Sequence, residues 1–322
     1  MNKTIKKILG CAVFLIIFAL LLMIVSVAFV PKDAKNESGT IDIRANAVLN
    51  EPENTIDALF IGDSECYSAF IPLRLWEKHG ITSYNCGTGA QNLYYSYEFV
   101  QKAFKVHSPN VVFLETNAIY RDFSLGADIV HKVGRFFPVF TYHDRWKGLF
   151  NTGKGKDNST GKVYIENDKG YVFKNNADPA LIEDYMEYTD KIARITAQNM
   201  NYIKDIKKLC DENEVKLVLI SVPSTVNWNT KRHNGIRALA DNLKLEYYDL
   251  NMMTDDIGID WSKDTRDKGD HLNYYGAIKV TDWLGEYIEK SNLCPNHKGD
   301  ENYNQWDKAL ESFYKKHDKD LQ

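Results

Sequence analysis

The chain has 322 residues, of which 44% are hydrophobic and 26% are charged, as is usual for folded globular proteins. Its formal net charge is −4, so no overall positive field favours nucleic acid as a partner. We therefore expect one large domain or two small ones, without a nucleic-acid-binding role.

The first 30 residues indicate a membrane anchor. Lys3, Lys6 and Lys7 precede an uncharged run of 23 residues, 8–30, which is long enough as a helix to cross a hydrocarbon core of roughly 30 Å. Lysines on the N-terminal side predict a cytoplasmic N-terminus and an extracellular remainder of the chain, at the cell membrane. The alternative is a signal peptide cleaved after Ala28, but the run exceeds the ordinary h-region of about 7–15 residues.

The rest of the chain is predicted to form an α/β domain. Residues 31–53 are mostly polar and are interpreted as a linker. Short apolar strands then alternate with helices, which indicates a three-layer α/β/α sandwich with a mostly parallel sheet. The expected strands are 55–61, 82–86, 110–116, 216–222 and 245–250. The expected helices are 72–79, 91–107, 181–213, 237–243 and 274–289.

Two segments depart from this alternation. Residues 122–180 are rich in aromatic residues, glycine, lysine and aspartate, and are interpreted as an insertion over the carboxyl edge of the sheet. The predicted catalytic domain, 54–294, contains this insertion. Residues 295–322 form a charged tail in which Trp306, Leu310 and Phe313 indicate an amphipathic helix.

The cysteines give no metal motif. Cys11 lies in the expected anchor, and the other four cysteines form no CxxC pair. Cys294 and His297 have a ligand-like spacing without a second such pair. We expect neither a metal nor a cofactor.

Three polar turns follow the first three predicted strands. Gly62-Asp63-Ser64 places a hydroxyl where ligands bind in open α/β sheets, although the tripeptide is also ordinary turn chemistry. The second turn contains Gly89 and Ala90, whose backbone N–H groups suit an oxyanion, or simply join a strand to a helix. Asn117, after the third strand, is either an amide donor to that oxyanion or a helix N-cap.

A histidine precedes the last predicted helix of the domain. His271 follows Asp270 directly and Asp267 by four residues, so either carboxylate could orient it as a general base. Asp267 is favoured, because four residues through a turn can bring two side chains together. A structural histidine is the alternative.

The motifs Gly62-Asp63-Ser64, Asn117 and His271-Leu272-Asn273 resemble, in their order, those of the SGNH (GDSL-like) hydrolases over about residues 55–290. The resemblance implies Ser64 as nucleophile, His271 as base, an acid before it, and oxyanion donors at Gly89 or Ala90 and at Asn117. The chain departs from the family pattern in two places. Ala118 follows Asn117 where an aspartate is frequent, and Lys268 stands three residues before His271 where the acid is expected.

An anchored SGNH domain is similar to the branch that includes alginate O-acetylation and teichoic-acid D-alanyl transfer proteins. This likeness implies a serine O-acyltransferase or esterase that acts on a cell-surface polysaccharide, with a multi-pass membrane acyltransferase as partner. In the insertion, His143 and Trp146 could bind a sugar or could pack the segment down. The competing hypotheses are a plain carbohydrate esterase and a non-catalytic surface module that binds polysaccharide or the membrane partner.

Overall fold

The computed structural model describes residues 2–29, 43–142, 168–180 and 184–321. The chain divides into two compact units. One unit contains residues 44–122 and 165–322, and we call it the catalytic unit after the role that the sequence predicts for it. The other contains residues 1–43 and 123–164, and we call it the anchor unit after the anchor that the sequence predicts.

The catalytic unit is built on a five-stranded sheet in which every neighbouring pair is parallel, with the order β2-β1-β3-β4-β5. The three central strands are almost entirely buried, as expected for a sheet covered on both faces. The predicted α/β fold class is confirmed, and each predicted strand is present but shorter at one or both ends. The strands are β1 Ala58–Ile61, β2 Ser83–Asn85, β3 Val111–Glu115, β4 Lys216–Ser221 and β5 Glu246–Asp249.

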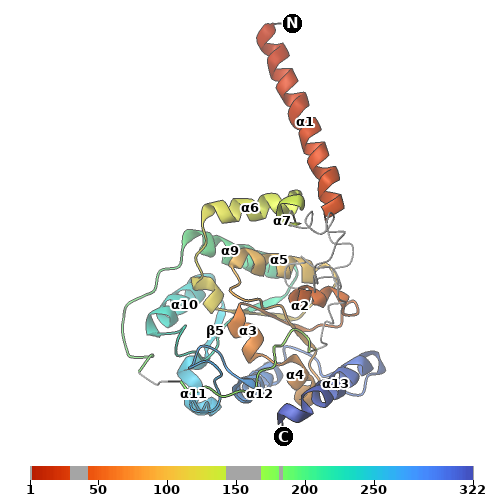
Figure 1. The fold of residues 1–322 in the computed structure, drawn as a ribbon. Helices are drawn as coiled ribbons and strands as arrows, with labels where there is room; N and C mark the ends of the chain where they lie inside the picture. The colour runs from red at the N-terminus through yellow and green to blue at the C-terminus, as the bar shows by residue number, and fades with distance from the viewer. Residues whose placement is uncertain (1, 30–42, 143–167, 181–183, 322) are drawn as a thin grey trace, which may run out of the picture. The chain divides into compact units, whose positions relative to one another are not determined.

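Helices cover both faces of the sheet (Figure 1). On one face α5, Leu93–Ala103, packs against α9, Ala197–Glu212, and the two helices contact β1 and β4. On the other face α12, Tyr274–Lys290, packs against α3, Ser64–Ala69, and α4, Pro72–His79. Alternate strand residues point to opposite faces, so Phe60 and Phe113 join the core on the α12 side.

Further helical segments complete the catalytic unit. They are α2 Ile43–Asn46, η1 Ala47–Asn50, η2 Asn117–Tyr120, α10 Thr230–Leu243, η5 Leu250–Met253, α11 Thr254–Ile257, η6 Glu301–Tyr303 and α13 Asn304–Leu321. α2 and η1 fall within the stretch interpreted as linker, yet Ala45 and Val48 are buried there. In α13 the buried stripe contains Trp306, Ala309 and Phe313.

The helix predicted over 181–213 is much shorter in the structure. Residues 184–196 are turns and irregular chain, and α9 begins only after Thr196, whose side chain accepts a hydrogen bond from Asn199 N. The segment before this cap is held by tertiary bonds instead, since the Asn234 amide donates to the carbonyls of Thr189 and Lys191. These contacts with α10 replace the bonds of a continuous helix.

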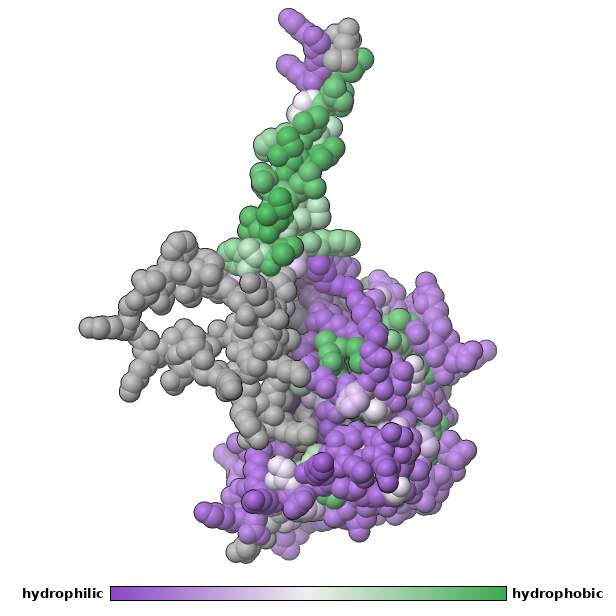
Figure 2. All heavy atoms as spheres, turned by 90° about the vertical axis from the view of Figure 1, so that its right-hand side faces the viewer, coloured by the Kyte–Doolittle hydropathy of each residue, from purple (hydrophilic) through white to green (hydrophobic). Residues whose placement is uncertain are grey.

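Over residues 2–29 and 123–142, the helices of the anchor unit are α1 Lys3–Phe29, α6 Leu125–Phe136 and α7 Val139–Tyr142. Among the described residues α1 is the one helix long and apolar enough to cross a membrane, and its apolar stretch is not buried. Figure 2 shows hydrophobic side chains along α1 beyond its hydrophilic N-terminal end. Residues 168–180, the remaining described part of the predicted insertion, belong to the catalytic unit.

Candidate active site

Ser64 begins α3 at the carboxyl end of the central strand β1. The chain turns sharply at Gly62, where an added Cβ would lie 2.6 Å from Glu115 Cβ and 2.8 Å from Cys66 Cβ. Glycine is therefore needed for β1 and β3 to approach this closely. The fold places Ser64 where ligands bind in open parallel sheets.

Asp63 organises the surroundings of Ser64. Its fully buried carboxylate caps α3 by accepting the Glu65 N–H at 3.0 Å. It also accepts the Asn117 amide at 2.9 Å and the Arg121 guanidinium at 2.8 Å. Three donors compensate for burial of this charge, so Asp63 has a structural task that fixes the position of Ser64.

Asn117 lies beside this network rather than capping a helix. Its Nδ2 donates to Asp63 Oδ2, and its Oδ1 accepts from Arg232 Nη1 at 2.8 Å. The residue before it, Thr116, is the N-cap of η2. An amide NH₂ has two hydrogens, so one remains for the developing oxyanion that the sequence predicts.

The glycine-containing turn after β2 presents the other predicted oxyanion donors. Gly87 N–H is bonded to the Asn85 side chain and Thr88 N–H to Gly62 O, so neither can serve a ligand without losing its partner. Gly89 and Ala90 follow in an exposed turn, and their N–H groups have no acceptor among the described residues. Ala90 adopts φ 54°, a conformation that more often belongs to glycine.

The loop before α12 folds back so that Asp267 contacts His271. Lys268 and Gly269 both have positive φ, 60° and 91°, and this reverses the chain within four residues. Asp267 then accepts the His271 backbone N–H at 2.6 Å and lies 2.7 Å from ring Nδ1. Asp270 Oδ2 is 3.6 Å from the same ring nitrogen. The geometry favours Asp267 as the orienting acid.

Hydrogen bonding also sets the charge of this acid. Burial alone would raise the pKa of Asp267, but the side-chain and backbone hydrogen bonds from His271 outweigh it and lower that pKa. Asp267 is therefore ionised at neutral pH and accepts the Nδ1 proton. That tautomer leaves a lone pair on Nε2, as a general base requires.

Two neighbouring segments brace the histidine loop. After β4, the Ser224 hydroxyl donates to Asp270 O at 2.8 Å, and Thr225 N–H donates to Gly269 O at 2.9 Å. Arg266 donates to the Ser68 hydroxyl at 2.8 Å, and that hydroxyl donates to Ser64 O at 2.6 Å. The loop of the base and the helix of the nucleophile are thus joined by direct bonds.

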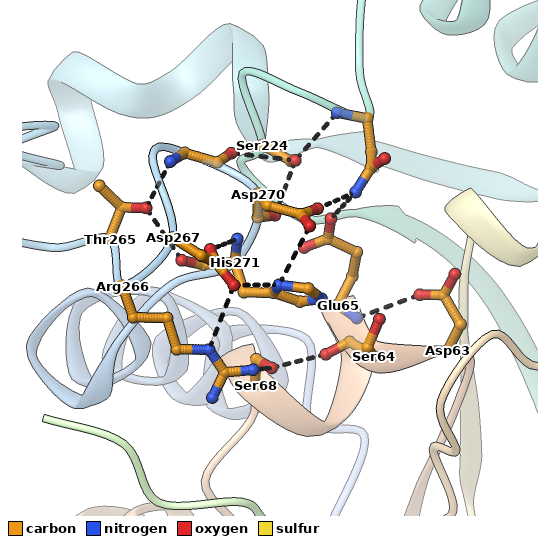
Figure 3. Close-up of polar contacts among 12 residues, drawn as sticks. Asp63, Ser64, Glu65, Ser68, Ser224, Thr265, Arg266, Asp267, Asp270 and His271 are labelled. Carbon is orange, nitrogen blue, oxygen red and sulfur yellow. Dashed lines mark hydrogen bonds and ion pairs between the residues drawn. The ribbon is translucent and has the colours of Figure 1, made fainter. Parts of the chain in front are cut away.

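Figure 3 draws the His271 ring beside the first residues of α3, among Ser64, Glu65 and Ser68. Nε2 of His271 is buried without a hydrogen-bond partner in the described structure. The Ser64 hydroxyl likewise makes no hydrogen bond to a described residue. Catalytic hydrogen bonds are often long in the absence of substrate and tighten when it binds.

Glu65 is the main participant that the sequence did not reveal. Its side chain is 1% exposed, and Asn227 Nδ2 donates to Glu65 Oε1 at 2.7 Å and also to Asp270 Oδ1. Glu65, Asp270 and His271 each bring one potential ligand atom within 4.8 Å of the others. Asn227 and Asp267 already occupy this group with hydrogen bonds, so we interpret it as a polar network. The sequence shows only that a glutamate follows Gly-Asp-Ser, and its contacts with the site become apparent only in the folded chain.

Burial favours the neutral form of two carboxyl groups near Ser64. Burial, reinforced by the charge of Asp63, raises the pKa of Glu65 and of Glu115 well above 4.5. One oxygen of each is buried without a hydrogen-bond partner in the described structure. Burial thus opposes the negative charge of two of the five acidic side chains around the site, which are Asp63, Glu65, Glu115, Asp267 and Asp270.

The structure brings Ser64, Asn117, Asp267, Asp270 and His271 together at the carboxyl edge of the sheet, where the sequence predicts a site. Gly89 and Ala90 are joined to it through the Thr88–Gly62 bond. His143 and Trp146 lie outside the described residues, so their predicted contact with a sugar stays a prediction.

No family model matches the chain, and no curated protein matches it. Solved structures match it at low similarity. A GDSL-like lipase from Bacteroides thetaiotaomicron is 14% identical with a TM-score of 0.35, covering 73% of this chain and 88% of its own. An esterase from a Pseudoalteromonas species is 10% identical with a TM-score of 0.39, covering 73% and 98%.

A lipase/acylhydrolase from Enterococcus faecalis is 10% identical with a TM-score of 0.39, covering 73% of this chain and 96% of its own. Likenesses at this level assign no role to this chain. The assignment of a reaction must therefore come from the side chains of the site itself.

Proposed function

We propose that the chain is a serine acyltransferase or esterase of the SGNH type. The observation that carries the proposal is the bond from His271 Nδ1 to Asp267, which leaves Nε2 buried and unpaired beside the helix of Ser64. This is the arrangement of an acid, a base and a nucleophile, in which one loop contributes Asp267 and His271 and α3 contributes Ser64.

In the proposed reaction, His271 Nε2 takes the Ser64 hydroxyl proton while Oγ attacks an ester or thioester carbonyl carbon. The resulting oxyanion is held by the remaining Asn117 hydrogen and by the N–H of Gly89 or Ala90. His271 then gives its proton to the leaving group, and an acyl-Ser64 ester remains. A hydroxyl of a sugar or of water, deprotonated by His271, releases the acyl group and restores Ser64.

The acceptor class is inferred from the anchor. An uncleaved α1 would keep Ser64 near a membrane-delivered acyl donor and so raise its local concentration. This supports O-acylation, such as O-acetylation, of a cell-surface polysaccharide on the extracellular side, with a multi-pass membrane acyltransferase supplying the donor. Plain ester hydrolysis is the second candidate, because the same acyl-Ser64 reacts with water if the site admits it.

The test is to incubate the full chain in detergent with an activated acetyl ester, with and without an oligosaccharide acceptor. We expect acetate or acetylated sugar to form, and Ser64→Ala and His271→Ala to lose at least 10²-fold in rate. Ser262→Ala, which removes an exposed hydroxyl away from the site, is the matched control and should retain the wild-type rate. Full activity in Ser64→Ala would contradict the proposal. The ratio of acetylated sugar to free acetate distinguishes acyl transfer from ester hydrolysis.

A further inference from the structure

Helix α6 of the anchor unit exposes an apolar stripe. Leu125, Ile129, Val133 and Phe136 follow the spacing i, i+4, i+8, i+11 and therefore share one face of the helix. Their exposed fractions are 60%, 51%, 38% and 79%. A helix on the surface of a water-soluble domain normally turns such a face toward the core, so the outward stripe of α6 needs an apolar surrounding.

One flank of this stripe is polar and mostly basic. Lys132 borders the stripe and bonds to Asp128 at 2.9 Å, and Arg135 and His131 follow farther around the helix. A helix that combines a basic flank with a stripe of large apolar residues is typical of segments that lie in a membrane interface, where anionic headgroups meet acyl chains.

The position of α6 relative to α1 identifies the apolar surrounding. Within the anchor unit α1 contacts α7, which follows α6 directly, and Val139 N–H donates to the buried Ser26 hydroxyl at 3.3 Å near the end of α1. Figure 1 shows α7 beside that end of α1 and α6 extending sideways from α7. If α1 crosses a bilayer, α6 and α7 lie where the helix leaves the hydrocarbon.

We propose that α6, together with α7, lies in the extracytoplasmic membrane interface, with its apolar stripe among lipid acyl chains. The proposal rests on the proposed anchor but not on the catalytic assignment. The chain enters the catalytic unit at Arg44, leaves it for α6 after Asp122 and returns at Ile165. With α6 in the interface, the catalytic unit would be tied to the membrane through all three junctions, which would limit how far the site can move from a membrane-delivered acyl donor.

The experiment uses the full chain in vesicles of phosphatidylglycerol and phosphatidylethanolamine. The photoreactive residue p-benzoylphenylalanine is placed at one position at a time, and adducts are identified by mass spectrometry after irradiation. Phe136 probes the apolar stripe, and Arg135 is the matched control on the polar flank of the same helix. Phe14, 65% exposed in α1, tests the anchor itself.

We expect lipid adducts at positions 14 and 136, with a yield at 136 several-fold above that at 135. Lipid adducts at 14 without adducts at 136 would overturn the interface proposal and leave the anchor intact. Crosslinks from 136 to peptides of the same chain would also overturn it, because the stripe would then pack on protein. Absence of lipid at both 14 and 136 would reject the anchor and the interface together.

Discussion

At the scale of single residues, the two aspartates before His271 have different tasks. Asp267 receives both hydrogen bonds from His271, whereas Asp270 is bonded to the Asn227 amide and lies farther from the ring. Asp267→Asn should reduce kcat by roughly 10²–10⁴-fold, because an amide in place of the carboxylate favours the wrong histidine tautomer. Asp270→Asn, of the same size and charge change, should have a much smaller effect. Steady-state kinetics on the two variants test which aspartate orients His271. A larger loss of kcat in Asp270→Asn than in Asp267→Asn would assign that role to Asp270.

Glu65 gives a pH-dependent prediction. Its pKa is raised by burial, so between pH 4.5 and that higher value the folded protein binds a proton that the unfolded chain has lost. The contribution of Glu65 to the free energy of unfolding is fully present below pH 4.5 and declines as pH rises through this window. Glutamine resembles the neutral acid and does not titrate. Glu65→Gln should therefore keep its activity and gain stability relative to wild type as pH increases.

Urea unfolding and ester hydrolysis measured at several pH values between 5 and 9 test this prediction. Glu65→Ala is the comparison, since it removes the acceptor for the Asn227 amide and should lose activity at every pH. If Glu65→Gln were as inactive as Glu65→Ala at neutral pH, activity would require the ionised carboxylate. The interpretation of Glu65 as a neutral acid would then be wrong.

At the scale of elements, the turn that carries His271 depends on Gly269. Its φ is 91°, and an added Cβ would lie 2.0 Å from Thr225 Oγ1 and 2.9 Å from Ala180 Cβ. Gly269→Ala should displace the loop and lower kcat. Gly258→Ala is a matched control, because Gly258 also has a positive φ, 77°, but open space around it. The control should lose about 1 kcal/mol in stability from backbone strain alone and keep its kcat.

Hydrolysis kinetics and urea unfolding of both glycine variants separate displacement of the His271 loop from backbone strain. An equal kcat for Gly269→Ala and wild type would show that the position of the His271 loop does not limit the reaction.

The elements also show what could be predicted from sequence. The five strands and the helix that begins at Tyr274 were predicted, because continuous apolar runs and helical periodicity are local signals. The helix predicted over 181–213 was too long, since the bonds from Asn234 that hold 189–191 come from another helix. Glu65 was missed for a related reason, because its partner Asn227 lies 162 residues away.

At the scale of the whole molecule, the apolar helix α1 and the polar site in the catalytic unit set two separate conditions for function. In the proposed function, the anchor determines where the acyl donor and acceptor would be met. The site determines whether acyl transfer would occur at all. The second condition is the central one, because without a nucleophilic Ser64 the anchor would only display a binding module.

The most direct measurement is therefore the mass of the Ser64 peptide. The full chain is mixed briefly with an activated acetyl ester, quenched in acid, digested and analysed by mass spectrometry, with His271→Ala as the control. The account predicts one acetyl group on Ser64 in the wild type and a greatly reduced amount in His271→Ala. Folded protein that neither carries acetyl on Ser64 nor hydrolyses the ester would contradict it.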